Sequence, residues 1–362
     1  MARAPRPEEE RPPHDALAGV KLPRETTMLV GHAAAEQALL EAYRSGRMHH
    51  GWILVGERGI GKATLAHRLA RFVFVHPDPA SAEVAQARDL SIASDHPAAR
   101  RVAIGVHANL LHLQRDWNER DRRYRTELSV ESVRRITPFL GTTAGESGWR
   151  IVIVDPADDM NRSAANAILK KLEEPPRRTI FLLLARSRGA LLPTILSHCR
   201  TLDLAPLSRD ETSALMREVA PDVADEQEGG LAAALAGGSV RRLIELRRNH
   251  GVALYRLMLA AIEQGDQQAQ IRLATQAGDA AIMEQFLELY RGYLARRVRG
   301  LDEPAEANPP AVPLVTWAEL WEKATLSGRE VETYNLDRRQ FVLDLLETSA
   351  ATLRQSGIPN RP

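Results

Sequence analysis

Short apolar runs and helical apolar stripes alternate along the first two hundred residues. Short apolar runs predict strands at 50–55, 150–154, 179–184 and 201–204, and residues 102–113 are expected to form a strand, either unbroken or interrupted by a turn. Apolar residues at spacings of three and four predict helices at 31–45, 60–75, 130–140 and 161–174. Because several strands are apolar throughout, the alternation predicts an α/β fold with a parallel sheet covered by helices on both faces.

The strand pattern stops at Pro206, and the rest of the chain reads as helical. Helices are expected at 208–219, 230–236, 239–248, 283–298, 315–326 and 336–355. A proline-rich stretch at 304–313 predicts a loop, and a charged, proline-rich N-terminus predicts a disordered tail. The predicted organisation is a tail over 1–27, an α/β domain over 28–206, a small helical domain over 207–250 and a helical domain over 251–362.

Composition narrows the class of protein. The 362 residues carry 48 Lys plus Arg and 47 Asp plus Glu, a net charge of +1, which excludes a strongly basic or acidic tail-type binder. The only cysteine is Cys199, which excludes a disulfide framework. No apolar run is long enough to span a membrane, and no signal core follows the N-terminus. The expected location is the cytoplasm.

A phosphate-binding loop lies between the first predicted strand and the helix after it. Gly56, Gly59, Gly61 and Lys62 have the spacing G-x-x-x-x-G-K of a P-loop, in strand–loop–helix context. Its glycines let backbone N–H groups turn toward an anion, the helix N-terminus adds a positive dipole end, and the lysine reaches the outer phosphates. The expected ligand is ATP or ADP. An inherited loop that only packs is the alternative.

One position of this loop departs from the pattern. The residue after the lysine normally supplies a hydroxyl to Mg²⁺, and here it is Ala63. Thr64 follows one residue later, about 100° further around the helix, and is expected to point elsewhere. Any nucleotide is therefore expected to bind weakly and without productive Mg²⁺.

The carboxylates needed for hydrolysis are also incomplete. Asp155 follows the strand 150–154, at the edge of the sheet where ligands gather, and could hold Mg²⁺ or its water. An ATPase of this type carries a glutamate next, but the residue here is Pro156, which offers no base. Asp158 and Asp159 come later, and we expect them to cap the helix that starts near Asn161. Two parts of the hydrolytic machinery therefore fail independently.

Three segments resemble one family. The stretch 166–176, NAILKKLEEPP, is similar to a segment of the clamp-loader AAA+ subunits of bacterial DNA polymerase III. The segment 193–200, PTILSHCR, resembles their P-T-I-x-S-R-C-R motif, and 238–241, GSVR, resembles their sensor-2 segment. Order and spacing agree across residues 29–250. Ala63 and Asp155-Pro156 place the chain nearer to the non-hydrolysing members than to the motor subunits.

The resemblance implies a RecA-like AAA+ P-loop domain, a helical lid and an all-α C-terminal collar. It also implies a hetero-oligomer with gamma/tau and delta subunits that loads the sliding clamp onto primed DNA during replication. Such a chain is an accessory subunit of the DNA-directed DNA polymerase, a nucleotidyltransferase holoenzyme, and a rigid stator without ATPase activity of its own. Within this resemblance, Arg241 corresponds to sensor 2, with a plain helix residue as the alternative.

Two features depart from the family. Members often carry a four-cysteine zinc module before the strand that ends in the aspartate, and this interval has no cysteine, so no zinc is expected. The arginine finger that members supply to a neighbour's ATP is replaced by His198, which lacks the guanidinium fork. Arg200, two residues on, is the candidate substitute at this trans-acting interface, with a surface arginine as the alternative.

Two functions compete on these observations. The leading hypothesis is a non-hydrolysing AAA+ scaffold within a clamp loader. The alternative is an active AAA+ motor, such as a gamma/tau-like subunit or a helicase loader, which would need Thr64 or water at Mg²⁺ and Asp158 as the base. A basic cluster over 120–125, interleaved with acidic residues, is interpreted as a solvated loop rather than a DNA-binding patch.

Overall fold

The computed structural model describes residues 13–141, 148–223, 229–299, 313–334 and 336–355. The chain forms two compact units, Met1–Ala220 and Pro221–Pro362. The boundaries predicted at 206/207 and 250/251 stay predictions. Each unit has a core of its own.

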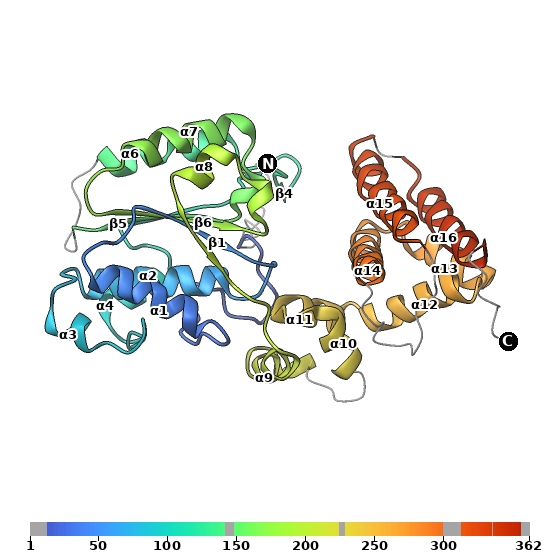
Figure 1. Cartoon of the computed structure of the whole chain (residues 1–362), viewed down its shortest axis with the longest axis horizontal. Coiled ribbons are helices and arrows are strands. Elements are labelled where there is room, and N and C mark those ends of the chain that lie inside the picture. Colours follow the sequence, from blue (N-terminus) through green and yellow to red (C-terminus); the bar gives the residue numbers. More distant parts are fainter. Residues whose placement is uncertain (1–12, 142–147, 224–228, 300–312, 335, 356–362) are drawn as a thin grey trace, which may run out of the picture. The chain divides into compact units, whose positions relative to one another are not determined.

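The first unit is built on a five-stranded parallel sheet (Figure 1). Its strands follow the order β2-β5-β6-β1-β7, so that the chain crosses over between neighbours. Their bounds are β1 Gly51–Val55, β2 Leu110–Leu113, β5 Arg150–Val154, β6 Thr179–Ala185 and β7 Arg200–Asp203. The central strands β1 and β6 are buried at every position, which explains their continuously apolar sequences.

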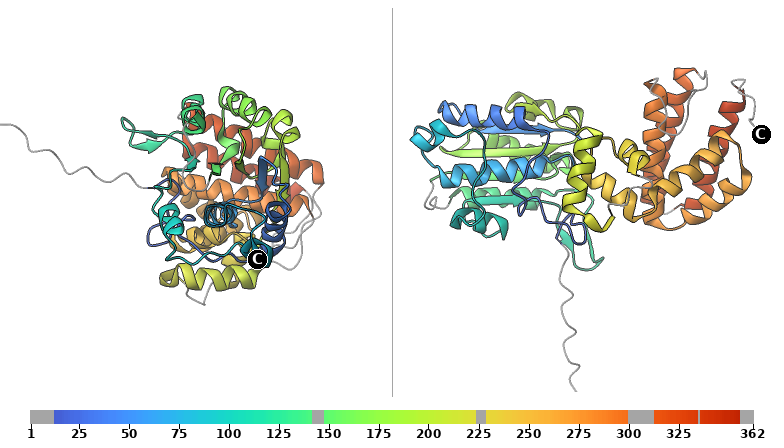
Figure 2. Two further views of the ribbon diagram at one scale, coloured as in Figure 1. Left: turned by 90° about the vertical axis from the view of Figure 1, so that its left-hand side faces the viewer. Right: turned by 90° about the horizontal axis from the view of Figure 1, so that it is seen from below.

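Helices cover both faces of this sheet (Figures 1 and 2). On one face lie α1 Ala33–Arg44, α2 Lys62–Val75, α3 Ala82–Gln86 and α4 Pro97–Ala103. On the other lie α5 Val130–Arg134, α6 Ile136–Gly141, α7 Arg162–Glu173 and α8 Pro193–Ser197. Alternate residues of each strand enter the two cores: Leu54, Ile153 and Leu182 face α2, whereas Ile53, Val152 and Phe181 face α7. The predicted α/β class with a parallel sheet is confirmed.

The second unit is helical wherever the structure describes it. Its elements are η3 Pro221–Val223, α10 Gly229–Ala236, α11 Val240–Arg248, α12 Gly251–Glu263, α13 Gln267–Gln276, α14 Ala280–Val298, α15 Leu314–Tyr334 and α16 Arg338–Gln355. Tyr255, Phe286, Tyr290, Tyr293 and Trp317 fill its core. The helical C-terminal region is confirmed, and the predicted loop over 304–313 lies almost wholly outside the described residues.

Several local predictions need correction. The region 102–113 is a strand only over β2, because Pro97–Ala103 forms a helix that His96 caps. The helix expected over 130–140 is two helices, since Pro138 cannot donate a hydrogen bond to the carbonyl of Arg134. Residues 117–118 and 123–124 pair as the antiparallel hairpin β3–β4, whose second strand lies within the segment 120–125 that was interpreted as a loop.

The N-terminal tail is also corrected in part. Residues 1–12 lie outside the described residues. Residues 13–27, predicted as disordered, pack along the first unit: His14 is 8% exposed, and the carbonyls of Arg24, Thr26 and Thr27 accept hydrogen bonds from arginines of α2. Buried arginine side chains on α2 need acceptors, and this segment supplies them.

Candidate nucleotide site at the carboxyl edge of the sheet

The phosphate loop joins β1 to α2 at the carboxyl edge of the sheet. Gly56, Gly59 and Gly61 have φ angles of 156°, 80° and 119°, which residues other than glycine rarely adopt. A Cβ at Gly56 would stand 2.8 Å from the carbonyl oxygen of Leu204, so space as well as conformation requires glycine there. The predicted strand, loop and helix are therefore all present around this motif.

Lys62 is the first residue of α2, and its ammonium is folded back onto the loop. Its Nζ donates to the carbonyl oxygens of Gly56 and Glu57, at 2.5 and 2.7 Å. Burial lowers the pKa of Lys62, and the negative charges of Asp155 and Asp158 oppose that shift. The structure thus brings the lysine close to the acidic residues after β5, as a P-loop requires.

Ala63 and Thr64 occupy the first turn of α2. Ala63 packs against the core between α2 and the sheet and carries no oxygen. Both residues are half-buried. The position from which a hydroxyl would reach Mg²⁺ is therefore a methyl group, and the residues here do not fit the metal in the usual way.

Asp155 continues β5 at the same edge. Its N–H donates to the carbonyl of Leu113 at 2.9 Å, and its side chain is 27% exposed. His112 Nε2 lies 3.6 Å from its Oδ2. The next residue is Pro156, so the position directly after Asp155, where an ATPase carries a glutamate, has no side chain that could activate a water.

Asp158 and Asp159 are bound by arginines and do not cap a helix, which corrects the expectation. The Asp158 side chain is 3% exposed, and its Oδ2 accepts hydrogen bonds from the backbone N–H and the Nε of Arg186, at 2.7 and 3.1 Å. Asp159 lies 3.4 Å from Arg115 and 3.6 Å from Arg186. Asn161 caps α7 instead, since its side chain accepts from the N–H of Ala164.

Arg186 is the functional candidate that sequence reasoning missed. It directly follows β6, whose carboxyl end lies beside those of β5 and β1. Its position directly after an apolar strand could have marked it as a candidate site residue. Its partners Asp159 and Asp158 lie 27 and 28 residues earlier, and only the strand order brings them beside it. At this edge two arginines neutralise the carboxylates that would otherwise attract a cation.

His198 and Arg200 lie away from this site. Arg200 pairs with Trp52 at the start of the parallel strands β7 and β1, the opposite edge of the sheet from the phosphate loop. Its guanidinium stands 6.0 Å from the Trp52 ring centroid. His198 ends α8, with its Nε2 3.9 Å from Glu173. Both residues therefore lie away from the phosphate loop of their own chain, and their trans-acting role stays a prediction.

Arg241 belongs to the second unit. It lies in the first turn of α11, where its Nε stands 2.8 Å from Glu245 in an i,i+4 ion pair. Its role as a phosphate sensor stays a prediction.

The described residues contain neither a metal-binding cluster nor a membrane-spanning helix. No group of three His, Cys, Asp or Glu side chains gathers where a metal ion could be held. No helix in the described part of the chain combines the length and apolarity needed to cross a membrane.

Comparison with known proteins gives a consistent set of relatives. Residues 31–208 match the family described as "DNA polymerase III, delta subunit". The DNA polymerase III subunit delta' of Pseudomonas aeruginosa is 33% identical over 220 residues, 60% of each chain. The DNA polymerase III subunit gamma of Buchnera aphidicola is 26% identical over 227 residues, 62% of this chain and 58% of that one. The chain thus spans about 60% of the length of these relatives.

Among solved structures, a gamma subunit-related protein of DNA polymerase III from Thermotoga maritima covers 87% of this chain and 100% of its own. The identity is 16% and the TM-score is 0.45.

Proposed function

We propose that this chain, which is similar over part of its length to delta' subunits of DNA polymerase III, is a clamp-loader subunit of that family and acts as a delta-prime-like stator. In this role it holds its place among gamma/tau and delta subunits in the cytoplasm and helps load the sliding clamp onto primed DNA. It does so without hydrolysing ATP itself.

The proposal rests on the residues at the carboxyl edge of the sheet, where the groups needed for hydrolysis are absent or already bound. Phosphoryl transfer depends on positioning and on neutralising charge around a metal-bound nucleotide. Here Ala63 cannot ligate the metal, Pro156 cannot activate water, and Arg186 occupies the carboxylate of Asp158. Each feature separately removes a part that turnover needs. A loop of this shape still suits a phosphate, so weak nucleotide binding without turnover is the expected behaviour.

The alternative, an active motor, has less support. It requires Asp158 to act as a general base, but that carboxylate is nearly fully buried and accepts two hydrogen bonds from Arg186. Arg186 would have to leave before any water could reach the group. The motor also requires a metal ligand in place of Ala63.

ATP turnover tests the proposal directly. The wild-type chain should hydrolyse ATP at background rate with or without Mg²⁺. The pair Ala63→Ser and Pro156→Glu restores the two missing groups and should raise Mg²⁺-dependent turnover above that background. Lys62→Ala, introduced both into the wild-type chain and into the double variant, is the control, because it removes the lysine expected to bind phosphate. Robust wild-type turnover that Lys62→Ala abolishes would refute the stator role.

Partners are tested by co-purification. The full chain should bring down clamp-loader subunits of the gamma/tau and delta kinds. Removal of residues 221–362, the whole second unit, should abolish that association if the helical C-terminal region forms the collar. Association that survives the removal would place the contact in the first unit.

A further inference from the structure

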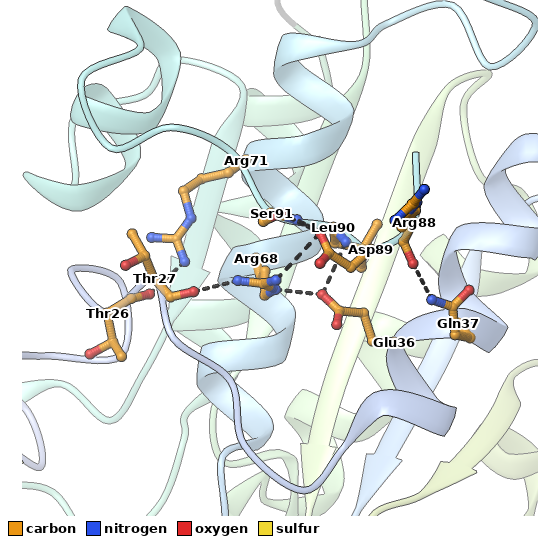
Figure 3. A network of polar contacts seen from close by, with 10 residues as sticks. All are labelled: Thr26, Thr27, Glu36, Gln37, Arg68, Arg71, Arg88, Asp89, Leu90 and Ser91. Carbon is orange, nitrogen blue, oxygen red and sulfur yellow. Dashed lines mark hydrogen bonds and ion pairs between the residues drawn. The ribbon is translucent and has the colours of Figure 1, made fainter. Parts of the chain in front are cut away.

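The N-terminal segment 13–27 is hydrogen-bonded to α2, the helix that follows the phosphate loop. Arg71 of α2 donates to the carbonyls of Arg24 and Thr26, at 3.1 and 2.6 Å. Arg68, one turn earlier, donates to the carbonyl of Thr27 (Figure 3). Both arginines are buried, at 3% and 9% exposed. The carbonyl acceptors satisfy donors that would otherwise be left unpaired in the interior.

The fastening is held in place by a second set of charges. Arg68 also pairs with Glu36 of α1, and its Nη2 stands 3.7 Å from Asp89 (Figure 3). Glu36 in turn accepts from the N–H of Leu90 at 3.0 Å. Residues 24–27 therefore have a fixed position beside α2, because moving them would take two carbonyl acceptors from the buried Arg71 and one from Arg68.

The other end of the segment reaches the phosphate loop. Asp15, with φ 57°, lies in a turn in which the N–H of Ala16 donates to the carbonyl of Pro13. Its Oδ1 stands 2.9 Å from the guanidinium of Arg58, the third residue of the loop. The neighbouring His14 is 8% exposed and accepts a hydrogen bond from Arg115 Nε at 3.0 Å. Its ring meets Tyr124 edge-on, with centroids 4.7 Å apart.

The partners of His14 and Asp15 come from separate places along the carboxyl edge of the sheet. Arg58 follows β1, whereas Arg115 follows β2, at the far end of the strand order. Arg115 also lies 3.4 Å from Asp159, after β5. The segment therefore crosses the edge between the loop and the acidic residues. A nucleotide bound to a P-loop places its outer phosphates between those two features.

We infer that residues 13–16 form a strap over the phosphate loop, and that a nucleotide must displace this strap to bind. The inference rests on the proposed function only in that both concern the same loop. The strap supplies a carboxylate to Arg58, which is the charge a phosphate would otherwise bring. Anchoring at residues 24–27 keeps the displaced strap close to the loop, so that it can return when the nucleotide leaves.

The strap contact is suited to reversible opening. Both members of the Arg58–Asp15 pair are about half exposed, at 48% and 38%, and exposed ion pairs contribute little to stability. Asp15 Oδ1 also stands 3.9 Å from Arg115, and loss of the Asp15 charge, which removes both pairs, should tighten nucleotide binding by about two- to fivefold. Removal of the whole turn, with the buried contacts of His14, should have the larger effect, about tenfold.

Two truncations and two substitutions test the strap. One chain begins at residue 13 and keeps the strap, and its matched partner begins at residue 17 and lacks it. Both retain the anchored carbonyls of residues 24–27, so thermal unfolding should show the same folded first unit. Asp15→Asn removes the charge while tolerating the positive φ, and Asp95→Asn on the exposed loop between α3 and α4 is its control.

Affinity for a fluorescent ATP analogue is measured by titration without Mg²⁺. The chain from residue 17 should bind more tightly than the chain from residue 13, and Asp15→Asn more tightly than Asp95→Asn. In the full chain, saturating nucleotide should speed hydrogen exchange at the amide of Ala16, because binding and strap closure oppose each other.

Equal affinities for the two truncated chains would overturn the strap. So would a chain from residue 17 that binds no nucleotide, because the strap would then not be what limits access. Neither result bears on the stator proposal, which is tested separately by ATP turnover and by co-purification with clamp-loader subunits.

Discussion

Arg186 and Asp158 show how single residues decide the chemistry of this edge. A carboxylate 3% exposed is stable as an anion only where a cation or hydrogen-bond donors compensate the loss of water. Arg186 does so with its own N–H and its Nε. The pair therefore matters for folding as well as for the absence of a base.

We predict that Arg186→Ala destabilises the first unit by about 1–3 kcal/mol, because the buried Asp158 keeps the backbone N–H of residue 186 but loses the guanidinium that compensates its charge. Arg188→Ala is the matched control. Arg188 lies two residues away and pairs with Asp203, but both side chains are more than half exposed, so its loss should cost less than about 1 kcal/mol. Urea unfolding of the two variants gives the comparison. Equal losses would mean that the Asp158 pair is no more important than a surface pair.

His67 is the most deeply buried titratable residue of α2 among those described. Burial lowers its pKa well below 6.5, helped by His112, whose ring lies edge-on at 5.1 Å. Folding thus requires the neutral imidazole, whereas the unfolded chain takes up a proton below pH 6.5. Unfolding then binds a proton, so stability must fall as the pH falls below 6.5.

We predict that the free energy of unfolding of the wild-type chain decreases between pH 7 and pH 5.5, and that His67→Phe reduces this decrease. Phenylalanine keeps a ring in the cavity and removes the titrating group. The control is His250→Asn at an exposed position, which should leave the pH dependence unchanged. A His67→Phe slope equal to that of the wild type would show that other groups produce it.

At the scale of an element, α7 shows how a helix start is chosen. Three polar residues, Asp158, Asp159 and Asn161, precede it, and each could serve as its cap. The structure uses Asn161, whose Oδ1 accepts from the N–H of Ala164 at 2.9 Å. The aspartates form a short 3-10 turn, Ala157–Asp159, and face the arginines.

We predict that Asn161→Ala lowers stability by about 1 kcal/mol through loss of this cap, and that Asn161→Ser restores most of it. Asp159→Asn is the comparison at the position that does not cap. It should disturb the pairs with Arg115 and Arg186 without changing the helix content. Circular dichroism with thermal unfolding separates the two effects. A larger loss of helix from Asp159→Asn would return the capping role to that residue.

At the scale of the whole molecule, the chain divides after Ala220. Helices α10 and α11 belong with the C-terminal helices, and α11 contacts α12 closely: a Cβ on Gly251 would stand 2.6 Å from Leu246. A lid predicted to end at residue 250 would separate these helices. The apolar residues of α11 are buried within the second unit.

We predict that a fragment of residues 1–220 folds cooperatively, whereas a fragment of residues 1–250 exposes the apolar face of α11 and binds a hydrophobic dye. Removal of partners from a buried apolar face leaves a patch that favours aggregation. Thermal unfolding and dye binding of the two fragments provide the measurement. A fragment 1–250 that is compact and binds no dye would support a separate lid ending at residue 250.

The predicted core elements came from local pattern. The bounds of strands β1, β5 and β6 were predicted to within about a residue. A short, continuously apolar run bounded by glycine, aspartate or proline is typical of a strand buried on both faces. The loop at Gly56–Gly61 was predicted equally well, since its glycines and Lys62 must lie at a set spacing within one short segment. The hairpin β3–β4 and helix α8 were missed because their sequences are short and polar or carry a proline.

The sequence by itself determined the class of fold, the phosphate loop and the absence of two hydrolytic groups, because each depends on residues that are close together in the sequence. Only the tertiary structure decided that Arg186 holds Asp158, and that His14 and Asp15 meet Arg115 and Arg58. Those partners are between 28 and 101 residues apart. The strand order brings them together, and no local pattern specifies which distant charges will share one edge of a sheet.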